Sequence, residues 1–311
     1  MIEDIVSIRL PVEETFRIRK NVIRRGEGKR VCVVTGIHGD ELEGQYVCYL
    51  LAQALNRHPE KLHGTVEIYP AANPLGIGSI ERGIPGFDLD MNRTFPGSDS
   101  GVMTEFVASR LVSDVAGADV VFDIHASNIF LTEIPQIRIN EKHRDVLLPL
   151  AEQANMDFVW VHGASTVLEA TFAYSLNSMG TPCLVVEMGV GMRLTGEYGQ
   201  QMTNGILNIM KNLGMWDGDV PPVSRPIISD GRDEVIFLNA RYSGMFMKTR
   251  SQGTWVKKGE TIGYVFDPLK GEIMEYVSAD KSGLLFTIRD YPLVDEGSLM
   301  GRILVRGSEK K

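Results

Sequence analysis

Cysteine is scarce in this chain of 311 residues, which contains three copies. Cys32, Cys48 and Cys183 each lie in an apolar stretch, and no two of them show the CxxC spacing of a redox motif or a sulfur-ligated metal site. The spacing therefore argues against a disulfide framework and against a cysteine-bound metal. We expect three buried thiols that pack as small apolar side chains.

The chain also lacks a membrane-length apolar run, a secretory signal and a surplus of basic residues. The first ten residues, MIEDIVSIRL, carry acids where a secretory signal carries bases. The net charge is -8, and no basic stripe offsets it, which argues against a nucleic-acid binder. We therefore expect a soluble, cytoplasmic protein without nucleic-acid or membrane partners.

The composition of the chain is typical of a globular protein. Hydrophobic residues make up 43% and charged residues 23% of the sequence, and the length predicts two domains or one large domain. In the first two thirds, short β-branched runs alternate with amphipathic patterns. We predict strands at residues 31–34, 65–71, 119–126 and 181–188, with one or two more in residues 1–30, and helices at residues 41–58, 102–115, 145–154, 166–178 and 197–212.

Residues 31–44, VCVVTGIHGDELEG, join a predicted buried strand to a predicted helix and contain a His-x-x-Glu pair. Asp40 suits a helix N-cap and Glu43 completes a capping box, which places Glu41 in the first helical turn and His38 in the preceding loop. An imidazole and a carboxylate at the end of a strand can bind one divalent ion. Taken alone, the motif favours a capped helix beside an ordinary histidine, because such a pair arises by chance in many chains.

Two later apolar strands also end in polar residues. Alternation along the first of them places Asp123 and His125 on one face, and the second ends with Glu187. In an open α/β sheet, ligands bind beyond the carboxyl ends of the strands, so His38, His125 and Glu187 are predicted to meet there. This convergence favours a metal site. We predict that Asp123 supports a ligand or caps the local backbone rather than being a ligand itself.

The pattern changes after the prolines at positions 221, 222 and 226. From residue 229 onward, short β-type runs alternate with glycines, and no strong helical pattern is present. We predict an α/β domain with a mixed sheet over residues 1–225, followed by a small all-β, barrel-like domain over residues 226–311.

Four short motifs occur in order along about 150 residues: GIHGDE at 36–41, DMNR at 90–93, DIH at 123–125 and VEMG at 186–189. Together they resemble the succinylglutamate desuccinylase and aspartoacylase family of zinc deacylases, relatives of the metallocarboxypeptidases. The resemblance implies a mixed-sheet α/β/α carboxypeptidase-like domain and a β-domain similar to biotinyl and lipoyl domains. It also implies that His38, Glu41 and His125 bind one Zn²⁺ ion per chain.

The same resemblance implies roles for four further residues. Glu187 would be the general base, Asn92 and Arg93 the clamp for a substrate carboxylate, and Arg82 the group that polarises the scissile carbonyl. Ordinary chemistry agrees, because a zinc ion with three protein ligands keeps a position for water, a nearby carboxylate can move its proton, and a planar guanidinium suits a carboxylate. The other histidines lie in polar settings and are assigned no role: His58, His63, His143 and His162.

The predicted function is zinc-dependent hydrolysis of the amide bond in a small N-acylated amino acid or amine that carries a carboxylate. The family's additional substrate-binding arginine, shortly before the catalytic glutamate, is missing, because residues 173–179 read AYSLNSM. Two alternatives stay open: a metallocarboxypeptidase that acts on peptides, and a metal-bearing binding protein without catalysis. The acyl group, the amine and the oligomeric state, a homo-oligomer included, also stay open.

Overall fold

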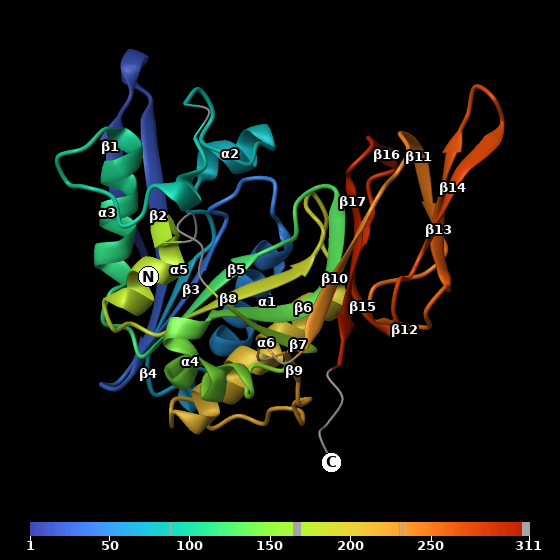
Figure 1. Cartoon of the computed structure of the whole chain (residues 1–311). Coiled ribbons are helices and arrows are strands. Elements are labelled where there is room, and N and C mark those ends of the chain that lie inside the picture. The colour runs from blue at the N-terminus through green and yellow to red at the C-terminus, as the bar shows by residue number, and fades with distance from the viewer. Residues whose placement is uncertain (88, 164–168, 230, 232, 307–311) are drawn as a thin grey trace.

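A long mixed sheet runs through the protein (Figure 1). The computed structural model describes residues 1–87, 89–163, 169–229, 231 and 233–306. The first part of the chain contributes β1 (Ile2–Arg9), β2 (Thr15–Arg25), β3 (Arg30–Thr35), β4 (Gly64–Tyr69), β5 (Val120–His125), β6 (Leu131–Asn140), β7 (Phe158–His162), β8 (Cys183–Gly189) and β9 (Ile227–Ser229). The later strands are β10 (Glu234–Asn239), β11 (Gly244–Lys248), β12 (Thr254–Val256), β13 (Thr261–Asp267), β14 (Glu272–Ser278), β15 (Gly283–Arg289), β16 (Leu293–Val294) and β17 (Leu299–Val305).

The strand order of the large sheet is β1-β2-β4-β3-β5-β8-β6-β15-β17-β10. The neighbours from β4 to β8 are parallel, whereas β1, β2 and β6 run antiparallel to their neighbours in this order. The carboxyl ends of β3, β5 and β8 therefore meet at one edge, which is where the candidate polar residues were predicted to converge.

Helices cover both faces of this sheet. They are α1 (Glu43–Arg57), α2 (Pro74–Ser79), α3 (Met103–Val115), α4 (Arg144–Ala151), α5 (Phe172–Ser178) and α6 (Gly196–Asn212), with short 3₁₀ turns η1 (Pro11–Glu13), η2 (Pro59–Lys61), η3 (Met91–Arg93) and η4 (Glu141–His143). The predicted helix at residues 166–178 begins outside the described residues, and α5 covers its second half.

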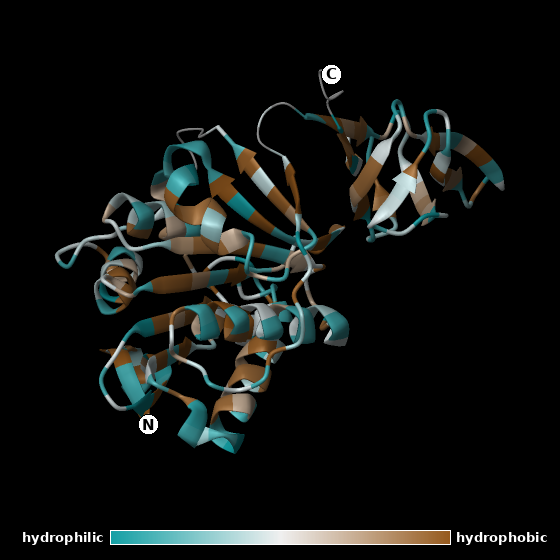
Figure 2. Ribbon diagram, turned by 90° about the horizontal axis from the view of Figure 1, so that it is seen from below, coloured by the Kyte–Doolittle hydropathy of each residue, from teal (hydrophilic) through white to brown (hydrophobic). Residues whose placement is uncertain are grey.

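Alternation along the strands divides the apolar core between the two faces. Val33 packs in the cluster formed with α1 and α6, whereas its neighbour Val34 packs in the cluster formed with α3 and α5. In Figure 2 the central strands are coloured mainly as hydrophobic, while the surrounding helices also carry hydrophilic residues. The predicted mixed α/β arrangement is thus confirmed. None of the helices in the described residues has the length and apolar character that a membrane crossing requires.

The strands after residue 229 gather at one side of the molecule (Figure 1). Strands β11, β13, β14 and β16 form a second sheet, and one apolar cluster joins its Phe246 and Val265 to Ile303 of the large sheet. Residues 233–306 contain no helix, as the sequence predicted. Because β9 pairs with β7 and β15 pairs with β6, strands from both sides of residue 225 share one sheet. The domain boundary and the barrel-like form stay predictions.

The predicted capping box at the start of α1 is wrong. The helix begins at Glu43 after Leu42, and no side chain caps it. Glu43 is buried, and its carboxylate accepts hydrogen bonds of 2.7 Å from the backbone N–H and from the hydroxyl of Thr195. A Cβ on Gly189 would lie 2.0 Å from Glu43 Oε1, and the φ angle of Gly189 is +67°. Contact with the loop after β8 therefore takes the place of capping.

Candidate metal centre

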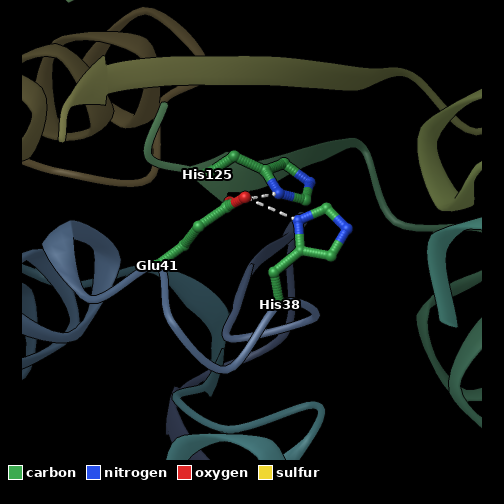
Figure 3. A group of neighbouring side chains, drawn as sticks. All are labelled: His38, Glu41 and His125. Atoms are coloured by element: carbon green, nitrogen blue, oxygen red, sulfur yellow. Dashed lines mark hydrogen bonds and ion pairs between the residues drawn. The ribbon is translucent and has the colours of Figure 1, made fainter. Parts of the chain in front are cut away.

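Three buried side chains converge at the carboxyl end of the sheet (Figure 3). Nδ1 of His38 lies 2.8 Å from Oε1 of Glu41, and Nδ1 of His125 lies 2.9 Å from Oε2 of the same carboxylate. One potential ligand atom from each residue lies within 4.8 Å of the others. The sequence-predicted ligand residues are thus brought together, although their chain separation is up to 87 positions.

Local structure explains how these side chains reach one point. His38 and Glu41 lie in the turn between β3 and α1, and His125 is the last residue of β5. Gly39 lets this turn pass close to α2, because a Cβ there would lie 2.0 Å from the backbone carbon of Gly76. This tight contact holds the turn against α2. The Glu41 side chain points between the two imidazoles (Figure 3).

A carboxylate lies behind each imidazole. Nε2 of His38 is 3.0 Å from Oδ1 of Asp90, and Nε2 of His125 is 3.1 Å from Oδ1 of the buried Asp123. A carboxylate hydrogen-bonded to one nitrogen, as Asp90 is to His38, fixes the tautomer of a ligating histidine and leaves the opposite nitrogen for the metal. Asp123 thus lies behind His125, and its role as a supporting acid stays a prediction. Sequence reasoning gave Asp90 no role, although the DMNR motif contains it.

The Glu41 carboxylate is surrounded by positive groups and hydrogen-bond donors. Arg82 donates from Nη1 to Oε1 at 2.8 Å, and the backbone N–H of Ala126 donates to Oε2 at 3.1 Å. Burial favours the neutral acid, but His38 and His125 hold the pKa of Glu41 well below its usual range. The carboxylate is therefore in its charged, metal-binding form, and the set of two imidazoles and one carboxylate fits a divalent metal ion.

Glu187 lies beside this group on the neighbouring strand. Residues His125 of β5 and Glu187 of β8 pair in register, so both side chains leave the same face of the sheet. Arg138 of β6 contacts the Glu187 carboxylate with an Nη1–Oε1 distance of 3.0 Å. Burial raises the pKa of Glu187 to about 7, against the lowering influence of Arg138. A carboxyl group with such a pKa can both accept and return a proton near neutral pH.

The other predicted site residues line the same pocket. Arg82 contacts Glu41 and also lies 3.4 Å from Asp90, with its side chain 41% exposed. Asn92 uses its Oδ1 to accept from the backbone N–H of Phe172 at 2.9 Å, which ties the loop to the start of α5. Arg93 donates to the carbonyl oxygen of Asn92 and has no carboxylate partner among the described residues.

The pocket has a volume of about 680 Å³, a size suited to a small molecule. Besides the predicted residues it is lined by Arg138, Trp160 and Tyr174, which sequence reasoning missed. His143 and His162, to which the sequence analysis assigns no role, also line it. Alternation within the strand at residues 158–162 was the signal for Trp160 and His162, because it places both on the face of Arg138.

Residues 27–213 match the succinylglutamate desuccinylase/aspartoacylase catalytic domain. The chain belongs to this family. The protein is therefore a member of a family of deacylases, as the four motifs predicted.

The chain is also similar to a known enzyme and, in its fold, to a solved structure. The N-alpha-acetyl-L-2,4-diaminobutyric acid deacetylase of Halomonas elongata is 28% identical over 295 residues, which cover 91% of this chain and 84% of that protein. The product-bound ectoine utilization protein EutE (DoeB) of Ruegeria pomeroyi superposes with a TM-score of 0.84 at 19% identity, covering 98% of this chain and 95% of the other.

A metallo-carboxypeptidase of Burkholderia cenocepacia superposes with a TM-score of 0.53 at 15% identity. The match covers 69% of this chain and 64% of the carboxypeptidase chain. This weaker similarity concerns the fold alone. It agrees with the prediction of a carboxypeptidase-like fold.

Proposed function

We propose that this protein is a zinc-dependent hydrolase that removes the acyl group from a small N-acylated amino acid. One observation carries the proposal: the buried group of His38, Glu41 and His125 shares its pocket with Glu187 and with guanidinium groups. Membership of a deacylase family supports the same reaction.

Two imidazoles and a carboxylate are the donor set of many catalytic zinc sites, and we propose that His38, Glu41 and His125 hold one Zn²⁺ ion. A zinc ion held by three protein ligands activates water near neutral pH and polarises a carbonyl group. Asp90 and Asp123 would keep both imidazoles in the orientation that presents Nδ1 to the metal.

In the proposed reaction, Glu187 accepts a proton from the attacking water and returns one to the leaving amine. Its position beside His125 and its raised pKa support both transfers. Arg82 lies against Glu41, from where its guanidinium can stabilise the negative charge that develops on the acyl oxygen.

The charges of the pocket favour a substrate with one carboxylate and an uncharged acyl group. Three of the four arginines that line it contact carboxylates: Arg82, Arg138 and Arg302. Arg93 has no such partner among the described residues, so its planar guanidinium is the group we assign to the substrate carboxylate. A dicarboxylic acyl group such as succinyl would find no second free guanidinium among these four.

Arg93→Lys should raise KM for the substrate by about tenfold while kcat and metal content stay close to wild type. Lysine keeps the charge but loses the two parallel donors that match a carboxylate. Initial-rate kinetics measure the effect, and Arg110→Lys, at an exposed position of α3, is the control. Equal turnover by wild-type enzyme of a substrate and its methyl ester would contradict the clamp.

The function itself is tested by assaying the zinc-loaded protein on N-acetyl amino acids, N-succinyl amino acids and short peptides. We expect the fastest hydrolysis with N-acetyl amino acids that carry a free carboxylate. Release of carboxyl-terminal residues from peptides without deacylation would favour a carboxypeptidase instead. Binding of these compounds without hydrolysis of any of them would favour a binding protein.

A further inference from the structure

A second group of buried charges lies on β6, next to the proposed base. Glu133 is fully buried, and its carboxylate accepts hydrogen bonds from three side chains on three strands. Arg138 of β6 donates from Nη2 at 2.7 Å, Arg302 of β17 from Nη1 at 2.6 Å, and Thr287 of β15 from its hydroxyl at 3.0 Å. Charge-assisted bonds of this number fix the position of a buried carboxylate.

An irregularity in β6 brings Glu133 and Arg138 to the same face. Five positions apart, their side chains would point to opposite faces of a regular strand. However, Glu133 pairs with Gly189 and Gln136 pairs with Glu187, so three steps along β6 match two steps along β8. This bulge moves Glu133 to the face that carries Glu187.

Arg138 connects this buried carboxylate to the proposed base. Its guanidinium contacts Glu133 through Nη2 and Glu187 through Nη1, at 2.7 and 3.0 Å. The ring of Trp160 on β7 lies 5.9 Å from the guanidinium carbon and shields it. Arg138 therefore touches both carboxylates and cannot turn away from Glu187 without losing its hydrogen bond to Glu133.

The contacts continue in register across the sheet into the C-terminal strands. Glu133 pairs with Thr287 of β15, and Thr287 pairs with Arg302 of β17. The aromatic ring of Phe237 on β10 lies 5.7 Å from the Arg302 guanidinium. Two guanidinium groups thus alternate with two carboxylates along the series Arg302, Glu133, Arg138 and Glu187, and their formal charges cancel.

We propose that Glu133 and Arg302 are positioning residues, which act through Arg138 to hold the Glu187 carboxylate in its working orientation. The proposal rests on the function proposed above for Glu187. It gives the C-terminal strands a part in catalysis although they contribute no metal ligand: Arg302 anchors Glu133, Glu133 orients Arg138, and Arg138 orients Glu187. A general base must stay within hydrogen-bond reach of its proton, so loosening this series should slow turnover without weakening substrate binding.

The test uses two pairs of variants. The first compares Arg302→Met with Arg302→Lys, and the second compares Glu133→Gln with the control Glu275→Gln. Glu275 is the matched control, because it is also buried in the C-terminal strands and bound by an arginine, Arg241, at 2.8 Å, but lies outside the pocket. We expect Arg302→Met and Glu133→Gln to lower kcat by about 10- to 100-fold with KM and metal content unchanged. Arg302→Lys, which keeps the charge beside Glu133, should recover most of kcat, and Glu275→Gln should keep all of it.

Wild-type kcat in Arg302→Met or in a folded Glu133→Gln protein would overturn the proposal, even if the melting temperature fell. Equal losses of kcat in Arg302→Lys and Arg302→Met would overturn it too, since the charge would then have no part. If Glu133→Gln does not fold, the Arg302 pair decides, because Arg302 is 18% exposed and tolerates change better. Glu187→Gln is measured alongside: full activity there refutes the base itself, whereas a large loss there with normal kcat in Arg302→Met refutes only the series.

Discussion

Glu187→Gln should lower kcat by about 10²- to 10⁴-fold while the protein keeps its fold and its metal. Glutamine has nearly the same shape and keeps a side-chain oxygen beside Arg138, but it cannot take up the proton of the attacking water. The position of Glu187 beside His125, rather than among the converging ligand atoms, is the reason to expect retained metal. Steady-state kinetics on an N-acetyl amino acid and metal analysis of the same sample measure both effects.

Glu197→Gln, at an exposed position of α6, is the control for this substitution and should behave as wild type. Loss of the metal together with activity in Glu187→Gln would identify Glu187 as a ligand instead. Full activity with metal in place would remove Glu187 from the mechanism and leave the base to another residue of the pocket.

His125→Ala should reduce the metal content of the purified protein from about one ion per chain to near zero and abolish hydrolysis. The substitution removes one of three ligands and also leaves the buried Asp123 without its histidine partner, so both the site and its support are lost. Elemental analysis after dialysis measures the metal, and the same sample is assayed for activity.

His63→Ala is the matched control, because His63 is an exposed histidine that also contacts an aspartate, Asp217, at 2.7 Å. This variant should keep its metal and its activity. Equal metal content in His125→Ala and wild type would refute the assignment of His125 as a ligand, and would require another set of ligands for any bound metal.

The sequence by itself determined which residues stand at the ends of the central strands. Apolar runs with β-branched residues mark β3, β5 and β8, and each run is followed or ended by a polar residue: His38, His125 or Glu187. Strand alternation also placed Asp123 beside His125 on the correct face. These inferences were correct because they depend on local periodicity and on the rule that parallel strands end at one edge.

Only the tertiary structure decided which partners the acidic residues around the site contact. Glu43 looks like a capping residue in sequence, but burial against Thr195 gives it a different partner. Asp90 reaches His38 across 52 positions, and Arg302 reaches Glu133 across 169. The Arg302–Glu133 pair depends on strand register and on one bulge in β6, whereas the Asp90–His38 pair joins two loops. Both pairs are set by contacts between distant segments, which no local pattern in the sequence contains.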